Sequence, residues 1–423
     1  MEIQNMGFYE SRKKSVKPIK TNVHLQVSLS IIRYMGTWPP QGRYRNLYFV
    51  YSFLVLNIIL GSFLFAQFGT IIMIWGDIEK MVSCGALLMT NIAHAFKVVV
   101  MLRHQKSIQI LLDSLQDELF TRNNERFKFI AYEYTWKGIF HHVAYQSFGT
   151  VAVLCWVFTS ISDLIIKHMK RLPIPLWYPF NVTNTPAFEL ITLQQTVGVI
   201  SGCFHNVAMD TLITGLITVA CCQFELLKTN IITIGSNVNH EFCKISHNEI
   251  NVTNVEDNEN KVWQEMRKCI AHNNKIIEFS KEIQSLFGTA IFLQFLANCV
   301  IICLTTFNMS QTTVFVPSEI LGTVAYTCCM VYQIFIYCWH GNELWLQSES
   351  VLRMSFTSNW WEHNRRYKKA LQMVMLRASR PVILTAGKLL KLSLETFVAS
   401  NIFFQILRVS YSLFTVLKTS TDH

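Results

Sequence analysis

Few side chains in this chain have the spacing that catalysis or metal binding requires. His240, Cys243 and His247 follow an H-x2-C-x3-H pattern, but no fourth ligand accompanies them, whereas structural zinc sites are closed by four ligands. Asp163 and Glu189 have no matched second carboxylate for acid–base work, and no nucleophile elbow or phosphate-binding loop is present in the sequence. We therefore expect neither an enzyme nor a metalloprotein, and no cofactor.

Polar chemistry is concentrated instead in the last apolar stretch, residues 392–418. A spanning helix needs about 20 mostly apolar residues, and this stretch is longer than that. Polar side chains recur along all of it: Thr396, Ser400, Asn401, Gln405, Arg408, Ser410, Tyr411, Ser412 and Thr415. Unsatisfied polar groups are costly in hydrocarbon, so one face must meet protein or water. We interpret this helix as the wall of a pore.

The C-terminal end of that helix carries the candidate pore residues. They are Tyr411, Phe414, Thr415, Leu417 and Lys418. A ring of apolar side chains can gate by dewetting, and a single Lys in a mixed ring is compatible with cation flow. Two alternatives stay open: Phe414 and Leu417 pack against lipid or neighbouring helices, and Lys418 snorkels to the membrane interface.

Composition indicates that the whole chain lies in a membrane. Of its 423 residues, 51% are hydrophobic and 15% are charged, against about 25% charged in soluble domains. Seven apolar runs can each span a bilayer: residues 47–75, 81–102, 139–166, 188–227, 283–307, 313–339 and 392–418. The expected fold is an all-α protein with seven transmembrane helices. The segments are an N-terminal arm (1–46), helices 1–6 with the ligand-binding half (47–341), an anchor segment (342–391) and the last helix with a short tail (392–423).

The net charge of +10 follows membrane topology rather than nucleic-acid binding. Thirty of the 37 Lys and Arg residues lie on one side of an alternating path and five lie on the other. The positive-inside rule then puts the N-terminus in the cytoplasm and the C-terminus outside. The sequons at Asn181 and Asn308 fall on the outer side, where glycosylation is expected, whereas Asn251 falls inside.

The connections also carry structural signals. Residues 171–186 contain four prolines and are expected to form a structured outer lid, and residues 237–261 are expected to form a mobile polar loop. Residues 265–287 and 365–376 have helical spacing, so helix 5 should begin below the membrane and a basic amphipathic helix should precede the last span. His141 and His142 are expected at the membrane interface.

Three blocks in the C-terminal third resemble the insect odorant receptor family. The first contains Tyr337-Cys338, Gly341-Asn342, Ser348, Leu352 and Ser358-Asn359-Trp360; the second contains Arg380-Pro381 and residues 384–388; the third contains residues 392–394, Thr396-Phe397, Ser410-Tyr411-Ser412 and Phe414-Thr415. Trp177-Tyr178-Pro179-Phe180 is similar to the family's outer loop. The modest fourth-to-fifth connection and the chain length resemble an odour-tuning subunit rather than the co-receptor.

This resemblance implies a ligand-gated, non-selective cation channel of four subunits, in the plasma membrane of olfactory sensory neurons. The chain would bind a small volatile odorant, a co-receptor of the same fold would complete the heterotetramer, and the seventh helix would line the pore. The alternatives are a G-protein-coupled receptor, which needs an outside N-terminus, and a transporter, for which we expect none of the buried carboxylate or histidine chains that transporters use.

The resemblance also implies an odorant site in the outer half of helices 2, 3, 4 and 6. On helix 3, small side chains and an aromatic ring share one face, which suits a volatile held by shape and dispersion. The candidate residues are Cys84, Leu88 and Asn91 on helix 2; Phe148, Gly149, Ala152 and Trp156 on helix 3; Thr196, Val199 and Ile200 on helix 4; and Thr323 and Tyr326 on helix 6. Each could instead be an ordinary helix-packing position.

Overall fold

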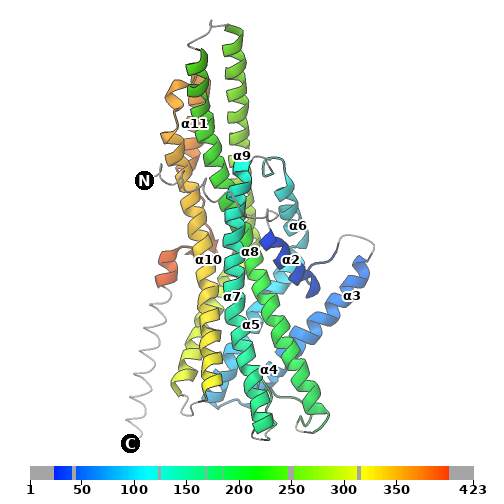
Figure 1. Cartoon of the computed structure of the whole chain (residues 1–423). Helices are drawn as coiled ribbons and strands as arrows, with labels where there is room; N and C mark the ends of the chain where they lie inside the picture. Colours follow the sequence, from blue (N-terminus) through cyan, green and yellow to red (C-terminus); the bar gives the residue numbers. More distant parts are fainter. Residues whose placement is uncertain are drawn as a thin grey trace, which may run out of the picture.

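Helices make up nearly all of the part of the chain that the structure describes (Figure 1). The computed structural model describes residues 23–40, 44–121, 125–166, 168, 170–182, 184–245, 252–311 and 316–399. The elements are α2 (Val23–Tyr34), α3 (Arg45–Leu56), η2 (Asn57–Gly61), α4 (Ser62–Met73), α5 (Ile78–Arg103), α6 (Gln105–Asp113), η3 (Ser114–Gln116), α7 (Glu125–Ile166), α8 (Ala187–Ile245), α9 (Val252–Gln311), α10 (Pro317–Thr357), η4 (Trp360–Glu362), α11 (Arg365–Ala378), β1 (Thr385–Ala386) and β2 (Leu390–Lys391).

Within the described residues, six helical stretches are long and apolar enough to cross a membrane. They are Arg45–Met73, Lys80–Arg103, Phe127–Ile166, Ala187–Ile234, Glu259–Met309 and Pro317–Thr357, and each overlaps one of the first six spans expected from the sequence. The first of them joins α3 and α4 through the π-helical turn η2. The seventh expected span, 392–418, is described only as far as residue 399.

Helix α8 is the centre of the bundle. Its most apolar stretch is entirely buried, while that of the first span is largely exposed. Helices α2, α7, α9 and α10 all pack against it. Small residues such as Ala208, Gly215 and Ala220 are buried or closely approached along α8, and they let neighbouring backbones come near.

The two longest helices, α8 and α9, project beyond the other spans and lie beside α11 at the top of Figure 1. At 1.5 Å per residue their 59 and 60 residues correspond to about 90 Å each, far more than the roughly 30 Å of a hydrocarbon core. The expectation of a loop over residues 237–261 is therefore wrong for residues 237–245 and 252–261, because α8 continues to Ile245 and α9 begins at Val252. Extending an existing helix adds a hydrogen bond per residue without a new nucleation cost, so a polar stretch can remain helical.

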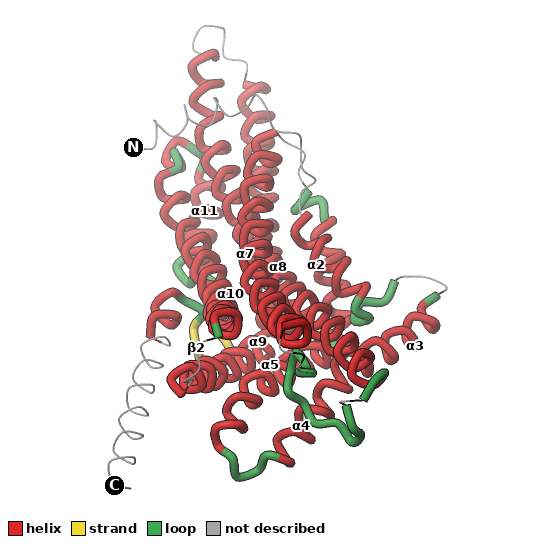
Figure 2. The backbone as a smooth tube through the Cα atoms, turned by 60° about the horizontal axis from the view of Figure 1, so that its bottom comes forward, coloured by secondary structure: helices red, strands yellow, loops and turns green. Residues whose placement is uncertain are grey.

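A small hairpin leads the chain into its last segment (Figure 2). Strands β1 and β2 pair antiparallel, and the turn between them has positive φ at Gly387 and Lys388, as a type I′ turn requires. Gln284 on α9 donates to the Thr385 carbonyl at 2.6 Å and accepts from its N–H at 2.6 Å. Gly341 on α10 lies against Leu392, where a Cβ would leave no room. The hairpin is thus fastened to both α9 and α10.

The end of the bundle at which α7 ends and α8 begins is closed by residues 170–182, which we call the lid. Arg171 forms ion pairs with Asp163 on α7 (3.4 Å) and Glu319 on α10 (2.6 Å). The Trp177 N–H donates to Thr70 Oγ1 on α4 at 2.8 Å, and the glycine at position 69 leaves space for the indole ring. The lid therefore joins α4, α7 and α10, in line with the structured connection expected from its prolines.

Gln195 on α8 is expected to hold the lid closed. Its side chain accepts from the Ile174 N–H (3.1 Å) and donates to the Ile174 carbonyl (3.2 Å). Gln195→Met leaves both buried backbone groups unsatisfied, which should lower the free energy of unfolding by about 1–3 kcal/mol. The thermal unfolding midpoint of the full chain in detergent measures this loss. The exposed neighbour Leu193→Met serves as the control, and an unchanged midpoint in Gln195→Met contradicts the prediction.

Candidate functional site

A cavity of about 90 Å³ lies beneath the lid, between the first span, α5, α7, α8 and α10. Ile174 of the lid forms part of its roof. Six of the residues expected from the sequence line it: Asn91, Gly149, Ala152, Trp156, Val199 and Tyr326. The walls are largely apolar with a few hydroxyl and amide groups, which is the usual composition of a small-molecule pocket.

The other six expected residues do not line this cavity. They are Cys84, Leu88, Phe148, Thr196, Ile200 and Thr323. On α5 the residues that do so are Leu87, Thr90, Asn91 and His94, so the cavity-facing side is displaced by about one residue, or 100° of helix rotation, from the expected face.

On the other helices each remaining residue has a different environment. Ile200 is 39% exposed, and the hydroxyls of Thr196 and Thr323 bond to carbonyls of their own helices. The Phe148 ring packs against Tyr332 at a centroid distance of 5.6 Å. These side chains lie on faces that meet solvent, lipid or neighbouring helices.

The first span contributes a wall that was not expected. Leu60 and Phe63 line the cavity, and the Phe63 ring occupies the space beside Gly198 on α8. Glycines at 149, 198 and 202 reach the cavity from two helices, and any Cβ added at Gly149 would collide with Cys203 Sγ. This clustering of glycines on facing helices is the sequence signal that could have identified the hollow.

An aromatic pair from α7 and α10 forms another part of the cavity wall. The rings of Trp156 on α7 and Tyr326 on α10 are 5.4 Å apart and tilted by 53°. The Tyr326 hydroxyl is hydrogen-bonded to Thr90, and it also donates to the Ala86 carbonyl at 3.3 Å. With that hydroxyl engaged by α5, the pair offers mainly ring surface to a ligand, so recognition here depends on shape and dispersion.

The floor of the cavity is a buried polar network centred on Asp210 of α8. The Asp210 side chain is 0% exposed and accepts from Lys97 Nζ on α5 at 2.6 Å. It also accepts from Tyr145 Oη on α7 (3.1 Å), Tyr337 Oη on α10 (2.8 Å) and Gln333 Nε2 on α10. Tyr145 is both a cavity-lining residue and a member of this network, so the floor is directly connected to the ion pair.

A second series of hydrogen bonds extends from the cavity through two histidines. His94 lines the cavity, and its Nε2 lies 3.1 Å from Nδ1 of His205. His205 Nε2 is hydrogen-bonded to Thr37 Oγ1 at 2.9 Å. The expectation that the spans hold no buried carboxylate or histidine chain is therefore wrong.

His141 and His142, which are expected at the membrane interface, both have partners on neighbouring helices. His141 is hydrogen-bonded to Tyr332 and His142 to Thr211, so both meet neighbouring helices within the bundle. The buried ion pair also had a signal in the sequence that was missed: Lys97 and Asp210 carry opposite charges within the second and fourth apolar runs. A charged side chain there requires a partner of the opposite sign.

Several sequence predictions fall outside what the structure describes. The candidate pore residues Tyr411, Phe414, Thr415, Leu417 and Lys418 all do, and so do the side chains of the H-x2-C-x3-H pattern at 240–247. The two sequons expected on the outer side are described at their asparagines, whereas Asn251 lies outside the described residues. Asn181 lies in the lid and Asn308 near the end of α9, so both belong to the lid end of the bundle.

The ion pair gives a direct test of the floor. Asp210→Asn leaves Lys97 buried without a counter-charge, which should cost about 3–5 kcal/mol of folding free energy. Adding Lys97→Met removes the stranded charge, so the double variant should regain a large part of that loss. The comparison is made on thermal midpoints and on the yield of folded protein in detergent. Strictly additive effects of the two changes would contradict a direct interaction.

Comparison with known proteins agrees with this architecture. The family model for the 7tm odorant receptors matches residues 77–411, which is most of the chain. Odorant receptor Or1 of Anopheles gambiae is 25% identical, with 93% of this chain and 94% of that protein covered. Odorant receptor 46a, isoform B, of Drosophila melanogaster is 22% identical, with 91% and 94% covered.

A solved structure has the same fold. The insect olfactory receptor OR5 from Machilis hrabei, in complex with eugenol, superposes with a TM-score of 0.76 at 15% identity. The match covers 91% of this chain and 96% of that one. The fold is thus the all-helical olfactory receptor fold, and the family match over residues 77–411 shows that this multi-pass membrane chain belongs to the insect odorant receptor family.

Proposed function

We propose that the chain is the odour-tuning subunit of a heteromeric, ligand-gated cation channel. A small volatile molecule binds in the cavity beneath the lid, and binding opens a pore lined by residues 392–418. The other subunits are a co-receptor of the same fold, and the assembly lies in the plasma membrane of olfactory sensory neurons with the N-terminus in the cytoplasm.

The observation that carries this proposal is the succession of contacts along α10. Tyr326 lines the cavity, Gln333 and Tyr337 bond to Asp210, and Gly341 packs against Leu392, where the last segment begins. These positions are spaced by 7, 4 and 4 residues, so they share one helix face. A ligand that displaces Tyr326 therefore acts on the same rigid element that holds the start of the proposed pore helix.

The chemistry of the cavity supports a volatile ligand. Glycines and aromatic rings surround a small volume with few polar groups, so affinity depends on apolar area and fit rather than on charge. The Machilis olfactory receptor of the same fold was solved with eugenol, a small molecule of that kind. The charge bias of the connections supports the proposed orientation.

Trp156 should select among ligands. Trp156→Ala removes a ring from the cavity wall, so potency for the best native odorant should fall about 10-fold or more, while bulkier odorants gain relative to it. Odorant-evoked currents in cells that also express a co-receptor measure the ranking. Phe158→Ala, an exposed aromatic two residues away on α7, is the matched control. Equal loss of response to every odorant, with loss of surface protein, would contradict the assignment.

Subunit role and orientation require a separate test. Odorant-evoked cation current should appear when the chain and a co-receptor are expressed together, and it should persist when G-protein signalling is blocked. An N-terminal epitope tag should be reached by antibody only after the cells are permeabilised. Labelling of the N-terminal tag on intact cells, or a response that disappears with the G-protein block, would overturn the channel proposal.

A further inference from the structure

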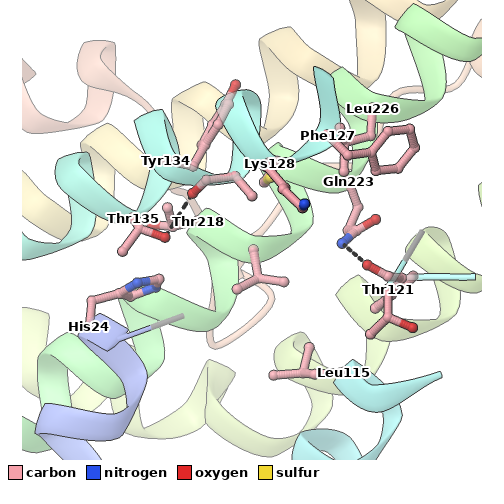
Figure 3. A pocket seen from close by; sticks show the side chains of 14 residues that line it. His24, Leu115, Thr121, Phe127, Lys128, Tyr134, Thr135, Thr218, Gln223 and Leu226 are labelled. Carbon is pink, nitrogen blue, oxygen red and sulfur yellow. Dashed lines mark hydrogen bonds between the residues drawn. The ribbon is translucent and has the colours of Figure 1, made fainter. Parts of the chain in front are cut away.

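A second cavity lies farther from the lid than the Asp210 network, near the middle of α8. Its volume is about 220 Å³, and it is bordered by α2, residues 115–121, α7 and α8 (Figure 3). Thr218 on α8 is about 45 Å along the helix from the lid-end residue Ala187, farther than the roughly 30 Å hydrocarbon core is thick. The two cavities share no lining residue among those described, and the Asp210 network lies between them along α8. This second cavity is therefore not an extension of the first.

His24 is the unusual residue of this cavity. Its side chain is only 5% exposed, and neither Nδ1 nor Nε2 has a hydrogen-bond partner among the described residues. In Figure 3 the His24 ring points into the space below Thr135 and Thr218. A buried polar group without a partner costs about 1–3 kcal/mol, which a bound molecule with a hydrogen-bonding group would offset.

Two glycines hold the His24 ring in this position. A Cβ at Gly138 on α7 would lie 2.8 Å from His24 Cγ, and a Cβ at Gly215 on α8 would lie 3.0 Å from Cδ2. Any larger residue at either position would displace the ring. The cavity therefore has a wall in which α7 and α8 are both shaped around the His24 imidazole.

The His24 ring is neutral at physiological pH. Burial lowers the pKa of His24 to about 4, with a smaller opposing effect from the Gly215 carbonyl and a smaller lowering from His142. A neutral imidazole presents one N–H donor and one nitrogen acceptor. A hydroxyl group, which both donates and accepts, matches this pair, whereas Lys128, which also lines the cavity, is already engaged in another interaction.

The rest of the lining suits an apolar body. Phe127 and Leu226 lie on the side away from His24, and Leu115 and Phe120 also line the cavity. Gln223 is already engaged, because it donates to the Phe120 carbonyl at 3.3 Å and its Oε1 lies 2.9 Å from His272 Nε2. The cavity thus combines the His24 ring, whose nitrogens have no hydrogen-bond partner among the described residues, with the apolar side chains of Phe127 and Leu226 at its other end.

We propose that this second cavity binds a small, neutral molecule with one hydroxyl group and an apolar body. The hydroxyl pairs with His24, and the apolar body lies among the Phe120 and Phe127 side chains. All the residues that line the cavity belong to this chain. The proposal does not depend on the proposed channel function, because its test measures binding of a small molecule rather than ionic current.

The test measures binding of 2-naphthol to the purified full chain in lipid nanodiscs, with naphthalene as the probe that lacks the hydroxyl. In wild type, 2-naphthol should bind to a class of sites that is lost or weakened at least 10-fold by His24→Leu. Naphthalene binding should change less than about 3-fold. Gln26→Leu is the matched control, because Gln26 is an exposed residue on α2, the helix that carries His24. This variant should leave both affinities unchanged.

A second variant covers the case in which His24→Leu perturbs folding. Ala131→Phe places a ring in the cavity from α7 and should remove both probes from this site while His24 is retained. Trp156→Ala, in the cavity beneath the lid, should not affect the His24-sensitive site, which separates this inference from the odorant proposal. Binding of 2-naphthol that is equal in wild type, His24→Leu and Ala131→Phe would overturn it.

Discussion

The buried ion pair between Lys97 and Asp210 is the interaction on which the arrangement of the bundle depends. Lys97 is 3% exposed and Asp210 is 0% exposed, so neither charge can be stabilised by water. A carboxylate in such surroundings needs several donors, and it has them from α5, α7 and α10. One side chain on the central helix therefore fixes the rotation of three neighbours, because turning any of them would strand a buried polar group.

The cavity beneath the lid follows from this constraint. With α5, α7 and α10 held at Asp210, the glycines and small residues of α7 and α8 leave a hollow toward the lid, and Tyr145 closes it below. The lid is in turn anchored by Arg171 and by Gln195 to the ends of α7, α8 and α10. Of the described helices, α10 alone lines the cavity, bonds to Asp210 and packs against Leu392.

Much of this could be predicted from the sequence, and the errors have physical causes. Long apolar runs identified the first six spans, and the spacing of Gly149, Ala152 and Trp156 identified the face of α7 that lines the cavity beneath the lid. The cavity-facing side of α5 was misplaced because it was chosen from the spacing of residues 84, 88 and 91 alone, whereas the polar side chains of Thr90, Asn91 and His94 mark the side that lines the cavity. Asp210 was overlooked because a single carboxylate in an apolar run becomes meaningful only when its partner on another helix is known.

The most direct test of the account is a density map of the chain, assembled with a co-receptor, bound to an odorant that activates it. The account predicts ligand density beneath the lid, in contact with Trp156 and Val199 and on the lid side of Tyr145, with the Lys97–Asp210 pair intact below it. Odorant density found only outside this cavity, or a separated Lys97–Asp210 pair in both the free and the bound channel, would contradict it.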